Sequence, residues 1–208
     1  PSLNASILSF YRNALGTLLA SPRLLLRGLR VLYRQRRAAA RRRTWKKRGV
    51  EVPPFLIISV TNRCNLKCAG CYQRLQHPDS AEAMDTATLE RIFREAEELG
   101  VGTILLAGGE PLTRTDLLAT AAKFPRILFP LFTNGLLLDD PALALLKKHW
   151  HILPVLSLEG DSGETDCRRG EGVFANALRL FPRLKARGIF CGTSFTVTRD
   201  NFPRLTGD

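Results

Sequence analysis

Three cysteines lie close together in the sequence, and their spacing is the feature best suited to chemistry. Cys64, Cys68 and Cys71 are separated by three and then by two residues. Thiolates are ligands for zinc and for the iron of iron–sulfur clusters. Three thiolates on one short loop can converge on one face of a cluster and leave its fourth position without a protein ligand. Because a reactive metal centre needs such an open position, the cysteines predict an iron–sulfur site.

A structural zinc site is the main alternative for the same residues. His77 follows Cys71 by six residues and would supply a fourth ligand beside the three thiolates, which would make the protein a zinc-stabilised binding module. The chain has five cysteines, and an odd number with three clustered disfavours a disulfide framework and predicts a reducing, cytoplasmic compartment. Cys191 lies in an apolar run typical of a buried residue, and Cys167 lies in a polar loop.

The elements that must position the cysteines begin after Pro54, where short apolar runs alternate with amphipathic helical patterns. The expected strands are residues 55–60, 103–107, 127–133, 152–158 and 189–197. The expected helices are residues 86–99, 115–123, 141–149 and 173–187. Nearly continuous apolar strands that alternate with helices are typical of parallel strands with crossover connections, so the pattern predicts an α/β fold.

Parallel strands end at one edge of their sheet, and α/β proteins bind ligands there. The cysteine loop follows the first expected strand, and Gly108-Gly109-Glu110-Pro111 follows the second. Asn134-Gly135 follows the third, and residues 159–163, Glu-Gly-Asp-Ser-Gly, follow the fourth. The most unusual polar and glycine-rich segments are therefore expected on the same rim.

The cysteine loop and the Gly-Gly-Glu-Pro segment, in this order, resemble the radical SAM family over most of residues 55–201. The resemblance implies a partial TIM-type (β/α)6 barrel, truncated here after about five βα units. It implies that Cys64, Cys68 and Cys71 hold a catalytic [4Fe-4S] cluster whose unique iron binds S-adenosylmethionine. Reductive cleavage of that cosubstrate would give a 5′-deoxyadenosyl radical that abstracts hydrogen from a substrate.

The resemblance also implies where the cosubstrate binds. Gly108, Gly109 and Glu110 would meet its amino group, because glycines allow close backbone approach and a carboxylate suits an ammonium donor. The remaining predicted binding residues lie on the same rim: Tyr72, Asn134, Ser157, Glu159 and Arg169. Arg169 would pair with the carboxylate of the cosubstrate. Two positions depart from the family pattern, since Gly70 replaces a common aromatic residue and Glu159 replaces the usual Asp.

The charge is distributed unevenly along the chain. The 208 residues carry a formal net charge of +12, which as one number suggests a nucleic-acid binder. Residues 1–50 hold 13 of the 31 Lys and Arg and no acidic residue, and residues 51–208 hold 18 basic and 19 acidic residues. Leucines at helical spacing on both sides of Ser21-Pro22 predict that residues 1–50 form a basic amphipathic helical arm. Residues 51–208 would form the catalytic core, incomplete at its C-terminus.

An arm with one leucine-rich face and many arginines is typical of a membrane-surface anchor. It predicts a peripheral location on the inner face of the membrane. Nucleic acid is disfavoured as a partner because phosphate binding needs no apolar face. Packing of the arm on the barrel, with its arginines in solvent, is the alternative that stays open.

Several partners follow from these predictions. The resemblance implies an electron donor such as flavodoxin or ferredoxin. It also implies a small-molecule, lipid or peptide substrate, and the sequence does not choose among these. A cluster-binding regulatory protein without turnover is a second alternative to the enzyme.

Overall fold

The computed structural model describes residues 22–73, 84–199 and 201–202. Within these ranges the chain forms an α/β structure with one parallel sheet, which confirms the predicted fold class. Residues 1–21, which form the first part of the predicted helical arm, and the candidate zinc ligand His77 both lie outside the described residues.

The strands are short and follow one another in the sheet in chain order, β1-β2-β3-β4-β5, with every neighbouring pair parallel. Their bounds are β1 Phe55–Ser59, β2 Thr103–Ala107, β3 Phe129–Thr133, β4 Ile152–Leu158 and β5 Gly192–Phe195. The helical elements are α2 Pro22–Lys46, α4 Thr86–Leu99, η1 Pro111–Thr113, α5 Leu117–Ala122, α6 Asp140–Lys148, α7 Ser162–Arg169 and α8 Val173–Ala186. All five expected strands and all four expected helices of the core are present.

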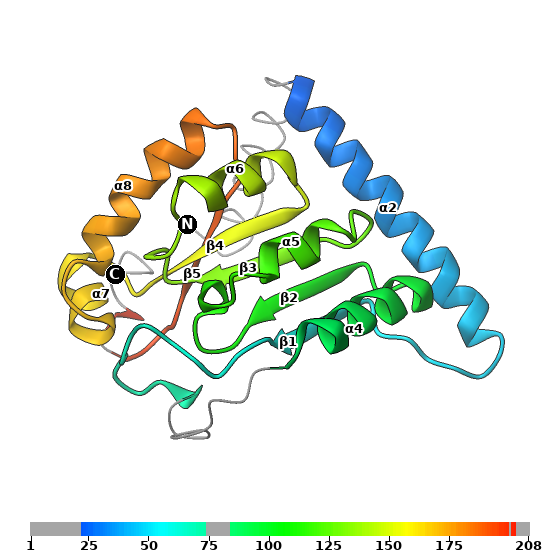
Figure 1. Ribbon diagram of the computed structural model, residues 1–208, viewed down its shortest axis with the longest axis horizontal. Helices are drawn as coiled ribbons and strands as arrows, with labels where there is room; N and C mark the ends of the chain where they lie inside the picture. The colour runs from blue at the N-terminus through cyan, green and yellow to red at the C-terminus, as the bar shows by residue number, and fades with distance from the viewer. Residues whose placement is uncertain (1–21, 74–83, 200, 203–208) are drawn as a thin grey trace.

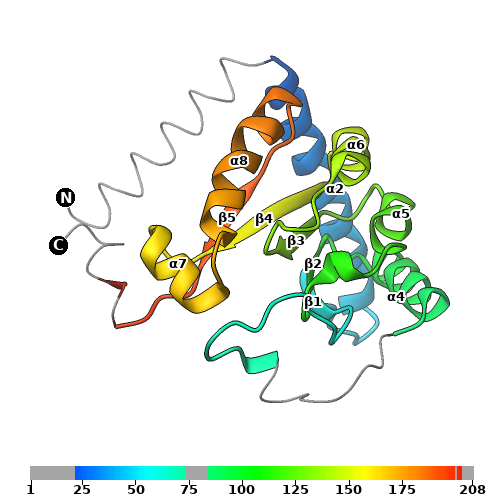
Figure 2. The same ribbon diagram turned by 60° about the vertical axis from the view of Figure 1, so that its left-hand side comes forward.

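One face of the sheet carries the hydrophobic core. Along β2, β3 and β4 every second side chain is buried, as expected for strands whose side chains alternate between two faces. Leu106, Phe129 and Leu156 belong to this buried set and pack with Phe93 of α4 and Leu180 of α8. Figures 1 and 2 show α4, α5 and α6 beside the sheet and α8 beside the edge of the sheet that β5 forms. The packing fixes the strand ends, and so the loops that follow them.

Helix α7 was not predicted from the sequence. Its sequence, SGETDCRR, has no apolar periodicity, and only Thr165 is buried. The helix begins because Asp161 accepts a hydrogen bond from the Glu164 backbone, while the Glu164 side chain accepts one from the Asp161 backbone. A capping box therefore starts a helix that hydrophobic spacing does not reveal.

Helix α2 crosses the end of the sheet where the strands begin, opposite the loop that follows β1 (Figure 1). Gln35 donates through Nε2 to the carbonyl of Gly102, 2.9 Å away, directly before β2. Arg41 and Arg42 donate to the carbonyls of Glu97 and Gly100 at the end of α4. Cationic donors suit the unpaired carbonyls at a helix C-terminus. No helix in the described part of the chain is long and apolar enough to cross a membrane.

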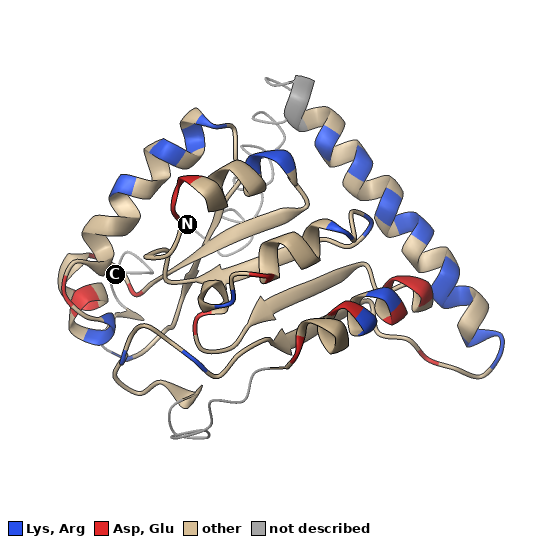
Figure 3. Ribbon diagram, viewed as in Figure 1, with Lys and Arg blue, Asp and Glu red and all other residues tan. Residues whose placement is uncertain are grey.

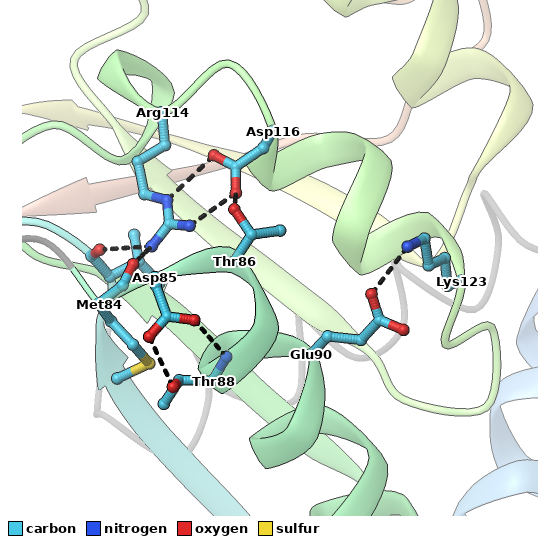
Figure 4. A network of polar contacts seen from close by, with 9 residues as sticks. Met84, Asp85, Thr86, Thr88, Glu90, Arg114, Asp116 and Lys123 are labelled. Carbon is cyan, nitrogen blue, oxygen red and sulfur yellow. Dashed lines mark hydrogen bonds and ion pairs between the residues drawn. The ribbon is translucent and has the colours of Figure 1, made fainter.

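A buried arginine ties the beginning of the cysteine loop to the loop after β2 (Figure 4). Arg114, whose side chain is 8% exposed, donates through Nε and NH2 to the two oxygens of Asp116, at 3.1 and 2.6 Å. Its NH1 donates to the carbonyls of Val60 and Met84. Thr86 also donates to Asp116. The network therefore connects the end of β1, the start of α4 and the segment that follows η1.

Asp116 is expected to make folding stability depend on acid pH. Hydrogen bonds from Arg114 lower the pKa of Asp116 from 3.8 to about 2. The ionised carboxylate therefore contributes stability that is present above pH 3.8 and is lost as the pH falls through about 2. The contribution is about 1–2 kcal/mol, because the one-third exposure of Asp116 weakens the interaction.

Urea denaturation as a function of pH measures this contribution. Asp116→Asn should lower the free energy of unfolding near neutral pH and flatten its decline in acid. Asp140→Asn is the matched control, since the Asp140 side chain is 71% exposed in its ion pairs with Arg183 and Arg187. Equal effects of the two substitutions would contradict the assignment.

Candidate active site

A cavity of about 430 Å³ lies at the carboxyl ends of the strands. This volume is within the usual range for small-molecule sites. Every predicted site residue except Glu159 contributes to its wall. The lining residues come from the cysteine loop, from the ends of β2, β3 and β4 and the segments that follow them, and from β5 and the segment that follows it: Cys64, Leu66, Cys68, Gly70, Cys71, Tyr72, Ala107, Gly108, Gly109, Glu110, Phe132, Thr133, Asn134, Ser157, Arg168, Arg169, Ser194 and Thr196.

The three cysteines of the loop after β1 are all free thiols facing this cavity. Burial raises the pKa of Cys64 and that of Cys68, and the positive charge of Arg169 acts against this increase at Cys68. A thiol that binds a metal loses its proton to become a thiolate, so iron could bind all three of these side chains. The donor set therefore fits the predicted cluster.

The arrangement of acidic, cysteine and histidine side chains is relevant to the zinc alternative. Within residues 22–73, 84–199 and 201–202, no three His, Cys, Asp or Glu side chains gather closely enough to hold one metal ion. The cysteines of a [4Fe-4S] cluster bind different irons, so their sulfurs need not converge on a single point. The fourth ligand of the predicted zinc site, His77, lies outside the described residues.

Two glycines let the loop after β2 contact the backbone of the cysteine loop. The Gly109 N–H donates to the Thr61 carbonyl at 2.8 Å, and the Glu110 N–H donates to the Arg63 carbonyl at 2.8 Å. A Cβ at Gly109 would lie 2.3 Å from the Arg63 oxygen, and one at Gly108 would lie 2.4 Å from the Thr61 oxygen. These glycines were predicted to approach a ligand, and the structure shows that they also approach the chain that carries the cysteines.

Glu110 is almost fully buried, with 1% of its surface exposed. Its Oε1 accepts hydrogen bonds from the Thr133 hydroxyl at 2.8 Å and from the Leu112 N–H at 3.1 Å, and its Oε2 accepts from the Asn134 N–H at 2.8 Å. Burial raises the pKa of Glu110, and these hydrogen bonds oppose the increase. Since each carboxylate oxygen can accept two hydrogen bonds, Oε2 retains capacity for one more donor. Glu110 therefore joins the β2 and β3 loops and can still accept from a ligand.

A buried ion cluster stands at the β4 side of the cavity. Glu159 is 2% exposed, and its Oε1 lies 2.6 Å from Arg169 NH2 and 2.5 Å from Arg168 NH1. Arg168 also bonds to the cysteine loop, because its carbonyl accepts from the Ala69 N–H at 2.8 Å and its Nε donates to the Ala69 carbonyl at 3.2 Å. Helix α7 thus connects the fourth strand to the residues between Cys68 and Cys71.

Glu159 is the one predicted site residue that does not line the cysteine cavity. The two arginines line the cysteine cavity, whereas Glu159 lines a neighbouring cavity of about 590 Å³ together with Cys167. Among the described residues, no group donates to Glu159 Oε2. The structure therefore places Glu159 where it orients the arginines. Cys191 was predicted as a buried residue in an apolar strand; it lies directly before β5 and is only partly buried against the core.

Further polar residues of the rim were not predicted. Ser194 is the register partner of Ser157 across β4 and β5, and Thr196 follows two residues later on the same side. Asn65 accepts a hydrogen bond from the Asn134 side chain at 2.8 Å. The sequence contained a signal for Ser194 and Thr196. They are two residues apart in the expected strand 189–197, so their side chains are expected on one face of that strand, the face on which Ser157 also lies.

Comparisons with known proteins agree with this geometry. The Radical SAM superfamily model matches residues 58–202. PqqA peptide cyclase from Gluconobacter oxydans is 32% identical over 157 residues, which are 74% of this chain and 44% of that protein. Fe-coproporphyrin III synthase from Methanosarcina barkeri is 32% identical over 151 residues, which are 71% of this chain and 38% of that protein. The chain therefore spans less than half the length of these curated relatives.

Solved structures show the same fold. SuiB of Streptococcus suis bound to S-adenosylmethionine is 26% identical, with a TM-score of 0.64, over 79% of this chain and 40% of that one. SuiB bound to its precursor peptide SuiA is 25% identical, with the same TM-score, over 83% of this chain and 39% of that one. The predicted family and the partial barrel are confirmed. The chain belongs to the radical SAM superfamily, whose members use a [4Fe-4S] cluster and S-adenosylmethionine.

Proposed function

We propose that this chain provides the part of a radical SAM enzyme that binds the cluster and cleaves S-adenosylmethionine. Three free cysteines, the Gly-Gly-Glu loop and two arginines lining one cavity at the strand ends carry the proposal. When both groups are bound, the cluster would supply the electron that cleaves the sulfonium of the cosubstrate into methionine and a 5′-deoxyadenosyl radical, and that radical would abstract hydrogen from the substrate. Flavodoxin or ferredoxin is the proposed source of that electron.

The side chains of the cavity divide the binding work. Cys64, Cys68 and Cys71 would hold the cluster. Glu110 would accept a hydrogen bond from the amino group of the cosubstrate through Oε2, which has one acceptor position left. Arg169 would pair with the carboxylate, since a guanidinium binds a carboxylate with two parallel hydrogen bonds.

The polar rim would hold the rest of the cosubstrate. Ser157 and Asn134 line the cavity from the ends of β4 and β3 and offer hydrogen-bonding groups to the ribose. Tyr72, which is 58% exposed, offers an aromatic face near the cysteines at a place where Gly70 has none. These roles extend the predictions of the sequence analysis to the observed cavity wall.

Analysis of bound metal separates this proposal from a zinc module. Protein purified and reconstituted without oxygen should contain iron and acid-labile sulfide in equal amounts and show the broad visible absorption of a cluster. One zinc per chain with no sulfide would overturn the proposal. Retention of the cluster without any cleavage of the cosubstrate would favour the regulatory alternative.

Glu159 is expected to act on the cosubstrate through Arg169. Glu159→Gln removes the charge that holds both arginines and should raise the KM for S-adenosylmethionine about tenfold, with a smaller effect on kcat. Initial rates of cleavage across cosubstrate concentrations measure the two constants. Glu171→Gln, at an exposed position beyond α7, is the matched control. An unchanged KM in Glu159→Gln would show that the arginines do not depend on this carboxylate.

We propose a peptide as the substrate. PqqA peptide cyclase and mycofactocin maturase MftC from Mycobacterium ulcerans, both among the sequence relatives, carry names that refer to peptide or maturation chemistry. The SuiB structure with a bound precursor peptide supports the same class. Transfer of deuterium from a labelled peptide into 5′-deoxyadenosine would establish that class, and transfer only from a labelled small molecule would overturn it.

A further inference from the structure

Helix α2 presents different residues to the core and to solvent. On the core side, Arg27 donates to the Gly188 carbonyl at 2.9 Å, Gln35 donates to Gly102, and Ala38 is buried. This side is thereby attached to the ends of α4 and α8 and to the start of β2. The attachment fixes which residues of α2 point away from the protein.

The opposite side of α2 exposes a set of large apolar residues. Leu26, Leu29, Leu32 and Tyr33 are 53–60% exposed, and Leu25 is 37% exposed. Leu25, Leu29 and Leu32 follow one another at spacings of four and three, so they form one stripe along the helix. Their exposure leaves an apolar face that no described residue covers.

A groove of about 410 Å³ runs beside that face, between α2 and the segment before β3. Arg30, Arg34, Arg37, Arg41 and Arg126 line it together with Tyr33. Within the described part of the chain, Glu97 is the one carboxylate in its wall, and it lies 3.4 Å from Arg126. The groove therefore has a large excess of positive charge, and Tyr33 belongs both to it and to the apolar face.

The crowding of charge in the groove favours an anionic ligand. Burial, with a further contribution from the charge of Arg30, lowers the pKa of Arg34. Arg34 also stacks on Trp150 with its guanidinium carbon 4.6 Å from the ring centroid. Figure 3 shows Lys and Arg along the whole described length of α2 and no acidic residue on it. Phosphate groups match such a row of guanidinium donors.

We infer that α2 binds to the surface of an anionic phospholipid membrane, with its exposed leucines in the headgroup boundary and headgroup phosphates in the arginine groove. Amphipathic helices with basic residues beside leucines bind such surfaces in this orientation. RNA would use the arginines but would gain nothing from the leucine stripe. A second copy of the chain would bring two basic helices together, and their charges would repel. The inference does not depend on the proposed chemistry. Helix α2 lies at the end of the sheet where the strands begin, and the cysteine cavity lies at the other end.

Vesicle flotation of the full chain of 208 residues tests the inference. The vesicles are phosphatidylcholine alone or phosphatidylcholine mixed with phosphatidylglycerol. The wild type should float with the anionic vesicles and not with the neutral ones, and added salt should weaken its binding. Absence of binding to anionic vesicles, or equal binding to both kinds, would overturn the inference.

Two variants separate the two parts of the surface. Leu25→Gln, Leu29→Gln and Leu32→Gln, combined in one chain, should weaken binding by at least about a hundredfold. Its matched control is Leu178→Gln, on the exposed side of α8.

Arg30→Gln combined with Arg37→Gln should weaken binding about thirtyfold. Its matched control is Arg91→Gln combined with Arg94→Gln on α4, where both side chains are more than half exposed. Circular dichroism should show that all variants fold. Folded variants that bind as well as the wild type would contradict the inference.

Sedimentation velocity and RNA binding complete the test. The wild type should sediment as a monomer without lipid, and excess RNA should not displace it from anionic vesicles. A dimer that the leucine substitutions dissociate would show that a second copy covers the face. Displacement by RNA that depends on Arg30 and Arg37 would assign the groove to nucleic acid. Either result would overturn the inference.

Discussion

Cys68→Ala is expected to abolish the formation of 5′-deoxyadenosine from S-adenosylmethionine. Cys68 lies between the other two cysteines in the chain, and its thiol faces the same cavity. Removing it leaves two thiolates, too few to hold three irons of a cluster. The rate of cleavage should fall by more than the roughly 10–100-fold decrease that follows when a residue hydrogen-bonded to a metal ligand is removed. Iron and sulfide content should fall together with activity.

Cys191→Ala is the matched control for this prediction. Cys191 is a free thiol that packs against the core away from the cavity, so its removal should leave the cluster and the cleavage rate unchanged. Product formation is measured by chromatography after reduction without oxygen. Cleavage by Cys68→Ala at the wild-type rate would remove the three-cysteine loop from the mechanism.

Gly109→Ala should have the second largest effect, although it adds a single methyl group. The new Cβ would lie 2.3 Å from the Arg63 oxygen and 2.9 Å from the Asn62 oxygen, both in the backbone of the chain that leads to Cys64. The two loops must then move apart, and the hydrogen bonds from Gly109 to Thr61 and from Glu110 to Arg63 are lost or lengthened. A displacement of about 1 Å in a catalytic arrangement costs about a hundredfold in rate.

The same substitution should lower stability by about 3 kcal/mol, because the methyl group meets backbone atoms that cannot rotate away. This corresponds to a decrease in Tm of roughly 10 °C for a chain of this size. Gly163→Ala is the matched control, since a Cβ there would make only an ordinary contact, 3.4 Å from Asp161. Wild-type melting and cleavage in Gly109→Ala would show that the two loops do not need this close approach.

The parts of the fold that hydrophobic periodicity controls could be predicted from the sequence. Strands β2 and β4 have the predicted bounds. The apolar run of β2 begins directly after Gly102, and that of β4 ends directly before Glu159. Strands β3 and β5 are shorter than the apolar runs 127–133 and 189–197 that predicted them. Apolar side chains at the ends of those runs, such as Ile127 and Ile189, are buried without belonging to a strand. Burial alone therefore does not define a strand end.

The parts of the site that depend on side-chain pairing could not be predicted. The cysteines, the Gly-Gly-Glu segment and Arg169 were found because their order along the chain places them on one rim. The pairing of Glu159 with both arginines depends on α7, a helix set by polar capping at Asp161. The role of Arg114 depends on two carbonyls from distant segments. A linear sequence gives no sign of such contacts.

The anaerobic reaction of the reconstituted wild-type chain with S-adenosylmethionine and a strong one-electron reductant tests the central claim most directly. The cavity that joins Cys64, Cys68 and Cys71 to Glu110 and Arg169 predicts formation of 5′-deoxyadenosine and methionine in equal amounts. The products should depend on both the cluster and the reductant. A reconstituted chain with a full complement of iron and sulfide that forms neither product under these conditions would contradict the account.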